Sequence, residues 1–195
     1  MLAVLDYGGG NLKSIVNRLE SFGVDYAVTD KAEDLSRADR IIFPGQGHFG
    51  QVMQALTFKG LAEPLITRIK QGVPFLGICV GLQVLFESSE EAPEVCGLGI
   101  LKGKIIRFTQ GKIPQIGWNK INVSAADTFL REDYFYFVNS YHTVCDDPSV
   151  VSATAEYHIP FTAAVEAGNI AATQFHPEKS GQAGHDALQR WIMKS

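Results

Sequence analysis

The cysteine at position 79 has the sequence surroundings of a catalytic nucleophile. It stands in the segment Gly77-Ile-Cys-Val-Gly81, between the apolar run 73–78, which predicts a buried strand, and residues 80–86, which predict a helix. The two glycines leave room for a sharp strand-to-helix turn with strained backbone angles. A helix N-terminus also favours the thiolate form of a thiol. The alternative is that Cys79 is a small buried apolar residue, as many free cysteines are.

A cysteine nucleophile needs a base, and one of the five histidines has a carboxylate two residues further on. His176 follows the predicted strand 170–175 and precedes Pro177-Glu178. In an extended chain, residues i and i+2 point to the same side, so His176 and Glu178 can share a face. The carboxylate can then hold one ring nitrogen while the other faces the thiol. By itself a histidine at a strand end is more often structural, and the cysteine segment favours the catalytic interpretation.

Two glycine-rich segments follow predicted strands of the first half. Pro44-Gly-Gln-Gly47 follows strand 40–43, at the edge where open α/β sheets build their sites, and it can bring backbone N–H groups close to a ligand. Acyl chemistry needs such donors where negative charge develops. The segment is also compatible with a plain turn. Tyr7-Gly-Gly-Gly-Asn11 matches neither dinucleotide nor phosphate-loop motifs, so we expect a close-approach turn or a partner surface there.

The order of the elements predicts one α/β domain over residues 1–195. The first half alternates strands with helices, which implies a mostly parallel central sheet flanked by helices. The second half is rich in strands and predicts an antiparallel extension, with Gly168-Asn169 as a hairpin turn. The predicted strands are 2–6, 25–29, 40–43, 73–78, 104–108, 120–123, 134–138, 150–157, 161–167 and 170–175. The predicted helices are 11–22, 61–70, 80–86 and 185–193.

Composition excludes several classes of protein. The chain has 195 residues, a net charge of −4 and no basic block, which argues against nucleic acid as a partner. The longest uncharged stretch, 71–86, is too short to span a bilayer, and the first residues show no basic region of a secretory signal. The three cysteines, Cys79, Cys96 and Cys145, favour neither a disulfide framework nor a zinc site. We therefore expect a cytoplasmic protein without a structural metal site.

Together, the cysteine segment, the Pro-Gly-x-Gly loop and the His-Pro-Glu segment resemble those of the class I glutamine amidotransferases. The resemblance runs the whole length of the chain. It implies that Cys79 is the nucleophile, His176 the base and then the acid, and Glu178 the group that orients the histidine. It implies an oxyanion hole made by the backbone N–H groups of Gly47 and Val80. It also implies glutamine-binding positions at Gly45, Gln83, Glu91, Ser140 and Tyr141.

Four longer segments resemble one branch of that family, the glutaminase subunits of imidazole glycerol phosphate synthases. They are 6–14 (DYGGGNLKS), 77–91, 114–119 (PQIGWN) and 136–142. Asn139 departs from this branch, where we expect histidine. The resemblance implies hydrolysis of L-glutamine to glutamate and ammonia through a cysteinyl thioester, which requires no metal and no organic cofactor. The ammonia would pass to a cyclase subunit of (β/α)₈ type, which makes imidazole glycerol phosphate and an aminoimidazole carboxamide ribonucleotide in histidine biosynthesis. Asn11, Trp118 and Asn119 are the candidate interface residues of this heterodimer, and we place them in loops.

Two alternatives stay open at this point. The chain could be the glutaminase subunit of another synthase, such as those for anthranilate, GMP or pyridoxal phosphate, although the Gly-Trp-Asn segment weighs against this. It could also be a non-catalytic partner or a cysteine-based redox sensor on the same fold. The His-Pro-Glu segment weighs against the sensor, because a sensor needs no carboxylate-oriented histidine.

Overall fold

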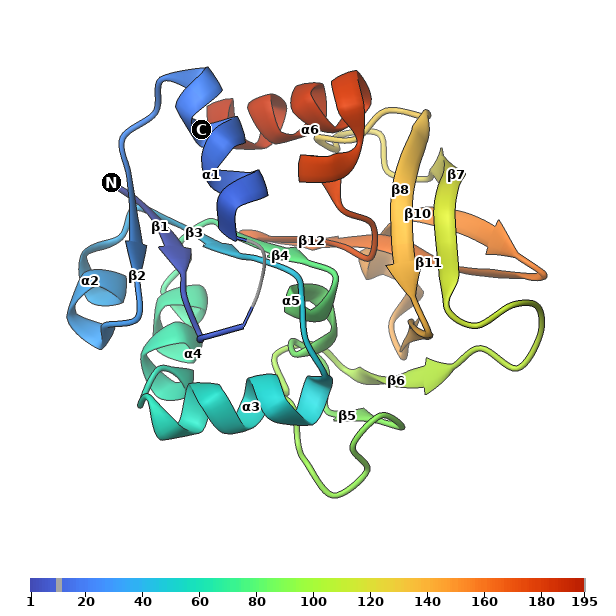
Figure 1. Ribbon diagram of the computed structural model, residues 1–195, viewed down its shortest axis with the longest axis horizontal. Helices are drawn as coiled ribbons and strands as arrows, with labels where there is room; N and C mark the ends of the chain where they lie inside the picture. The colour runs from blue at the N-terminus through green and yellow to red at the C-terminus, as the bar shows by residue number, and fades with distance from the viewer. Residues whose placement is uncertain (10–11, 195) are drawn as a thin grey trace.

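The protein is described by a computed structural model, which covers residues 1–9 and 12–194. Its strands form one sheet in the order β2-β1-β3-β4-β12-β11-β10-β7-β8, with β5, β6 and β9 attached beside it (Figure 1). The strands are β1 (Leu2–Leu5), β2 (Tyr26–Thr29), β3 (Arg40–Phe43), β4 (Phe75–Ile78), β5 (Ser88–Ser89), β6 (Gly103–Arg107), β7 (Gln115–Val123), β8 (Tyr134–Asn139), β9 (Tyr141–Cys145), β10 (Val151–Tyr157), β11 (Ile159–Ala167) and β12 (Ile170–Thr173).

Helices cover both faces of the parallel part of the sheet. They are α1 (Leu12–Phe22), α2 (Ala32–Arg37), α3 (Phe49–Phe58), α4 (Ala62–Lys70), α5 (Val80–Gln83) and α6 (Gly181–Met193), with 3-10 turns η1 (Pro148–Val150) and η2 (Pro177–Lys179). Figure 1 shows α1 and α6 on one side of the sheet and α3 and α4 on the other. Ile15 of α1 and Leu188 of α6 belong to the core cluster that holds Val4, whereas Leu56 of α3 belongs to the one that holds Leu5. Alternate side chains of each buried strand thus serve opposite cores.

The mixed sheet confirms the fold class that the sequence predicts. Strands β2, β1, β3, β4 and β12 are parallel neighbours, and β12 then pairs antiparallel with β11. The turn between β11 and β12 is at Gly168-Asn169, where Gly168 has φ +59°. Because β12 enters the parallel sheet directly beside β4, the residues that follow these two strands meet at one edge. Cys79 follows β4, and residues 174–176 follow β12.

Several element predictions need correction. Helices α2 and α3 and strand β9 were not predicted, and the helix predicted over 80–86 ends at Gln83. Strand β7 begins at Gln115 rather than at position 120, so Trp118 and Asn119 lie in a strand and not in a loop. Neighbouring residues of a strand point to opposite faces, so these two side chains diverge. None of the helices in the described part of the chain is long and apolar enough to cross a membrane.

Candidate active site

Cys79 occupies a strained turn between β4 and α5. Its backbone has φ +51° and ψ −104°, an unusual conformation for a residue with a side chain. The Cys79 N–H donates to the carbonyl of Thr173 at the end of β12, at 2.7 Å. A Cβ added to Gly77 would lie 2.4 Å from the Gly81 carbonyl oxygen, and one added to Gly81 would lie 2.6 Å from that of Phe43. Both glycines are therefore required for the chain to turn here.

The loop 44–47 lies directly against the cysteine. A Cβ on Gly45 would lie 2.1 Å from the Ile78 carbonyl oxygen and 2.7 Å from the Cys79 Cβ atom, so only glycine allows this approach. The Tyr7 hydroxyl secures the loop, because it accepts a hydrogen bond from the Gln46 N–H at 3.1 Å and donates to the Gln46 carbonyl. Burial raises the pKa of Tyr7 to about 12, so the hydroxyl keeps its proton near neutral pH.

His176 and Glu178 form a buried pair at the end of β12. The Nδ1 atom of His176 lies 2.7 Å from Oε1 of Glu178, and the two residues are 0% and 8% exposed. The predicted reason for the pairing was wrong, because the chain is not extended here. Residues 177–179 form the 3-10 turn η2, with His176 as its N-cap. The turn is held by the His176 N–H, which donates to the Tyr136 carbonyl at 2.9 Å, and by the Ser180 hydroxyl, which donates to the His176 carbonyl at 2.6 Å.

The second ring nitrogen of His176, Nε2, is left free by the contact with Glu178. Nε2 is buried and has no hydrogen-bond partner in the described part of the chain. Burial lowers the pKa of His176, but the electrostatic interaction with Cys79 and the hydrogen bond with Glu178 outweigh burial and raise it to about 10. The surroundings of His176 therefore favour the charged ring, which the carboxylate of Glu178 stabilises.

The family is decided by a match over almost the whole chain. The model of the family described as glutamine amidotransferase class-I matches residues 3–194. This chain belongs to the class I glutamine amidotransferases. The match includes Cys79, His176 and Glu178, so the resemblance of the sequence segments to this family is confirmed.

Relatives of this amidotransferase place it within the family. The imidazole glycerol phosphate synthase subunit HisH of Methanothermobacter thermautotrophicus is 46% identical, over 98% of each chain. The protein of the same name from Thermus thermophilus is 47% identical, over 93% of this chain and 91% of its own length. Among solved structures, PurLQS from Thermotoga maritima superposes with a TM-score of 0.77 at 22% identity, over 98% of this chain and 96% of that chain. The structural match shows the shared fold.

Two of the positions implied to bind glutamine are used within the amidotransferase itself. Oε2 of Glu91 accepts a hydrogen bond from the Phe49 N–H at 2.6 Å, at the start of α3. Nε2 of Gln83 donates to Oε1 of Gln174 at 3.0 Å, and Gln83 is 6% exposed. In this structure, Glu91 caps a helix and Gln83 contacts a residue beside the nucleophile.

The remaining predicted positions lie around the second half of the sheet. Ser140 lies between β8 and β9, and its carbonyl accepts from the Phe108 N–H at 3.1 Å, whereas the Tyr141 carbonyl accepts from Asn139 Nδ2 at 2.9 Å. Trp118 is 56% exposed on β7. The Asn119 side chain, in contrast, is bonded within the chain, since its Nδ2 atom donates to the Glu156 carbonyl at 2.8 Å. Asn11 lies outside the described residues.

Gln174 is the site residue that the sequence analysis missed. Its Nε2 atom lies 3.5 Å from Sγ of Cys79. It stands two residues before His176, in a run that predicts a buried strand, and an uncharged amide there gives no signal of chemistry. Its position beside the thiol arises because β12 pairs with β4, so only the tertiary structure reveals it.

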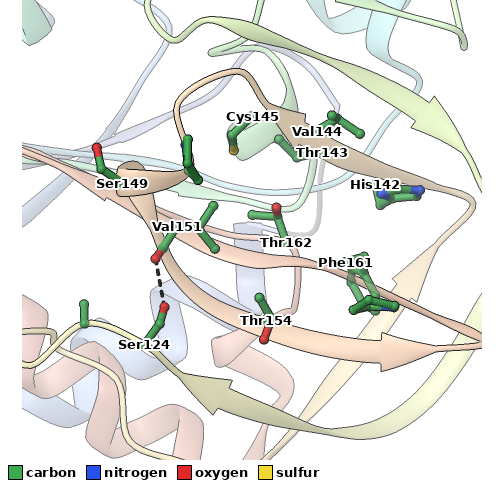
Figure 2. Close-up of a pocket in the computed structure, with 13 residues that line it drawn as sticks. Ser124, His142, Thr143, Val144, Cys145, Ser149, Val151, Thr154, Phe161 and Thr162 are labelled. Atoms are coloured by element: carbon green, nitrogen blue, oxygen red, sulfur yellow. Dashed lines mark hydrogen bonds between the residues drawn. The ribbon is translucent and has the colours of Figure 1, made fainter.

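A cavity of about 690 Å³ lies apart from these residues, in the antiparallel part of the sheet (Figure 2). Figure 2 shows Thr154 and Thr162 on neighbouring strands, with Ser124 and Val151 at one end and His142 at the other. No residue of the Cys79 site lines it. Within the described residues, no group of three or more His, Cys, Asp or Glu side chains is placed to hold a metal ion.

Proposed function

We propose that the chain is the glutaminase subunit of an imidazole glycerol phosphate synthase. It hydrolyses L-glutamine to glutamate and ammonia and supplies the ammonia to a cyclase subunit. The observation that carries the proposal is the buried His176–Glu178 pair, which leaves Nε2 of the ring without a partner in the described residues and which follows β12, the strand beside the one that ends at Cys79. The names of relatives that are 46% and 47% identical over nearly the whole chain support the choice of synthase.

The first half of the reaction uses the thiolate–imidazolium pair directly. The Cys79 thiolate attacks the side-chain amide carbon of glutamine, and the carbonyl π electrons move to the oxygen. The proton on His176 Nε2 then passes to the departing nitrogen, the C–N bond breaks and ammonia leaves. The product on the enzyme is a γ-glutamyl thioester of Cys79. Glu178 holds the ring in the orientation that presents Nε2.

Formation of the thioester changes the role of His176. The sulfur no longer carries a negative charge, so the largest contribution that raises the pKa of His176 is removed. Burial, which lowers that pKa, then favours the neutral ring. Neutral His176 can take a proton from water as the water attacks the thioester carbon. The C–S bond breaks to release glutamate and restore the thiolate–imidazolium pair.

The oxyanion and the substrate are assigned to backbone groups and side chains around the turn. We assign the oxyanion hole to the N–H groups of Gly47 and Val80, because Gly47 lies in the loop that approaches Cys79 and Val80 begins α5. Each such donor contributes about 3 kcal/mol to transition-state stabilisation in hydrolases. Contacts to glutamine are assigned to the backbone and side chains of Gly45, Gln83, Glu91, Ser140 and Tyr141.

The cyclase partner is assigned to the exposed surface of β7 and β8. Ile116, Trp118 and Tyr134 are 60%, 56% and 57% exposed, although large apolar side chains of this kind usually avoid water. Trp118 packs edge-on against Tyr136, whose carbonyl receives the His176 N–H. The proposed interface is therefore joined to the active site through one strand. We further propose that residues 1–195 act as a single amidotransferase domain, that the partner is a (β/α)₈ cyclase, and that the heterodimer is cytoplasmic.

The test mixes the purified chain with candidate synthase subunits and measures glutamate release. The imidazole glycerol phosphate cyclase subunit, with its nucleotide substrate, should stimulate turnover and convert glutamine nitrogen into product. The synthase subunits for anthranilate, GMP and pyridoxal phosphate serve as matched controls and should not. Stimulation by one of these and not by the cyclase would overturn the choice of synthase. Absence of glutamate release with every subunit would overturn the glutaminase itself.

A further inference from the structure

A chain of two side-chain amides ends on the sulfur of Cys79. Nε2 of Gln83 donates to Oε1 of Gln174 at 3.0 Å, and Nε2 of Gln174 donates to Sγ of Cys79 at 3.5 Å. The distance to sulfur is longer than to oxygen because sulfur is the larger atom. The direction is consistent along the chain, since each amide gives a hydrogen and Gln174 also accepts one.

All three residues are fixed by the backbone. The Gln174 N–H donates to the Ala163 carbonyl at 2.8 Å, and the residue is 0% exposed. Gln83 is one helical turn from Cys79, and its N–H donates to the Cys79 carbonyl at 3.2 Å. Both side chains are buried, so their amide groups cannot turn freely in water, and the N–H end of Gln174 is held towards the sulfur.

We propose that Gln174 is a hydrogen-bond donor to the Cys79 thiolate and that Gln83 is the positioning residue that keeps this donor end in place. The inference deepens the proposed glutaminase function and rests on it for its catalytic meaning. A carboxamide can present either its oxygen or its N–H group to a neighbour. Because Gln83 offers an N–H group to Oε1 of Gln174, the opposite end of that amide is left for the sulfur. A hydrogen-bond donor stabilises the negative charge of a thiolate, whereas an amide oxygen would repel it. The arrangement therefore favours the thiolate, which is the nucleophilic form.

The test measures the rate of Cys79 alkylation by iodoacetamide against pH, in the isolated chain and without glutamine. Mass spectrometry of the Cys79 peptide separates it from Cys96 and Cys145. Gln174→Leu removes the donor, and Gln174→Glu keeps the acceptor for Gln83 but presents only oxygens to sulfur. Both variants should slow alkylation at pH 7 about tenfold and move the midpoint of the rate–pH curve upward by about one pH unit. The two effects correspond, because one unit of pKa changes the fraction of thiolate tenfold below the midpoint. Gln83→Leu should have a smaller effect in the same direction.

Gln115→Leu is the matched control, because Gln115 is also a buried glutamine on a strand and its Oε1 atom has no partner in the described residues. It should leave the alkylation midpoint unchanged. An unchanged midpoint in both Gln174 variants would overturn the proposal, as would an equal shift in Gln115→Leu. If Gln174→Leu does not fold, as judged by thermal melting, Gln174→Glu and Gln83→Leu decide the question. Because no glutamine is used, failure here is distinct from failure of the glutaminase assignment.

In the glutaminase reaction, Gln174→Leu should change kcat with little change in KM, because Gln174 is not among the residues assigned to bind glutamine. Gln174→Leu should lower kcat at pH 7 and recover part of it at higher pH, where more thiolate forms without help. Loss of activity that is the same at every pH would indicate structural damage and contradict the proposed donor role.

Discussion

Glu178 reaches back across a single 3-10 turn to place its Oε1 atom 2.7 Å from Nδ1 of His176. This contact fixes the ring and leaves Nε2 as the only nitrogen able to exchange a proton. It also places a carboxylate where it stabilises the imidazolium form. Loss of the ring and loss of the carboxylate charge should therefore affect the rate and its pH dependence differently.

His176→Ala should reduce glutamate release by roughly 10²–10⁴-fold, because it removes the proton carrier. Glu178→Gln should reduce it less, since the amide keeps a hydrogen-bond partner but loses the charge. His158→Ala and His185→Ala are the controls and should retain most of the activity. Equal losses in all these variants, measured beside their melting temperatures, would indicate damage to folding and contradict the assignment.

Glu178→Gln should also change the pH dependence of the acylation step. The proton on His176 is present below its pKa of about 10 and is lost as pH rises through that value. Removal of the Glu178 charge removes one contribution that raises this pKa, so the alkaline limb should move to lower pH. Single-turnover release of ammonia measured from pH 7 to 11 checks the shift. A limb at the same pH in both proteins would show that Glu178 does not stabilise the charged ring.

Gly45→Ala should abolish glutaminase activity and lower stability. The new methyl group would lie 2.1 Å from the Ile78 carbonyl oxygen, and backbone on both sides leaves little room for relief. Gly60→Ala is the control, because it is the same substitution at a position where no atom lies within 4 Å of the added Cβ. Because Gly60 has φ +65°, the alanine variant should still lose about 1–2 kcal/mol of unfolding free energy, the cost of a left-handed conformation for a residue with a Cβ atom. Similar urea midpoints for the two variants would contradict the close approach at Gly45.

Trp118→Ala should weaken stimulation by the cyclase with little change in melting temperature. Trp118 is 56% exposed, so the isolated chain loses few contacts, whereas an interface loses an aromatic anchor. Trp191→Ala is the matched control, because Trp191 is 4% exposed and packs in the core beneath Arg40. That variant should lower the melting temperature strongly. Full stimulation of Trp118→Ala across a titration of the cyclase would exclude this surface as the interface.

His142 should make the protein sensitive to mild acid. Burial lowers the pKa of His142, and neither ring nitrogen has a hydrogen-bond partner in the described residues. The native state therefore holds the neutral ring, while the unfolded chain takes up a proton below its ordinary value of 6.5. The stability contribution is present above pH 6.5 and is lost as pH falls. His142→Phe, beside Phe108 and Phe161, should thus gain in urea midpoint relative to the unchanged chain between pH 7 and 5.

The exposed His158 provides the control for this pH dependence. His158→Asn keeps a residue that tolerates the positive φ of 59° at that position and should leave the slope of stability against pH unchanged. A parallel pH dependence in His142→Phe and the unchanged chain would contradict the buried neutral state.

The predictable part of the site was the part encoded locally. Gly77, Cys79 and Gly81 mark the sharp turn between the strand predicted over 73–78 and the helix that follows it. His176 and Glu178 were paired correctly, but for the wrong local geometry, since Pro177 begins a 3-10 turn instead of continuing the strand. The sequence shows which residue types are present and how they are spaced. The conformation of the backbone between His176 and Glu178 depends on hydrogen bonds with Tyr136 and Ser180, which the sequence does not show.

The parts that were missed depend on contacts between distant segments. Helix α5 ends at Gln83 because the next N–H groups bond three residues back instead of four: Leu85 donates to the Leu82 carbonyl and Phe86 to the Gln83 carbonyl, each at 3.2 Å. The Val84 carbonyl is taken by the N–H of the distant Leu98, at 2.8 Å. Helix α3 is an exception, because its local sequence does have a helical apolar pattern that was overlooked. The pattern is formed by four buried side chains, Phe49, Val52, Met53 and Leu56. Gln174 has no local signal, because its role arises only where β12 meets β4.

The central claim is that Cys79 generates ammonia from glutamine for a partner, and Cys79→Ser tests it most directly. Glutamine-dependent and ammonium-dependent formation of the cyclase product are measured with the heterodimer of each protein. Serine keeps the shape of the site but is a far weaker nucleophile with this base. The account predicts that Cys79→Ser loses glutamine-dependent product and glutamate release while it keeps ammonium-dependent product and the complex. Glutamate release by Cys79→Ser at nearly the rate of the unchanged chain would contradict it.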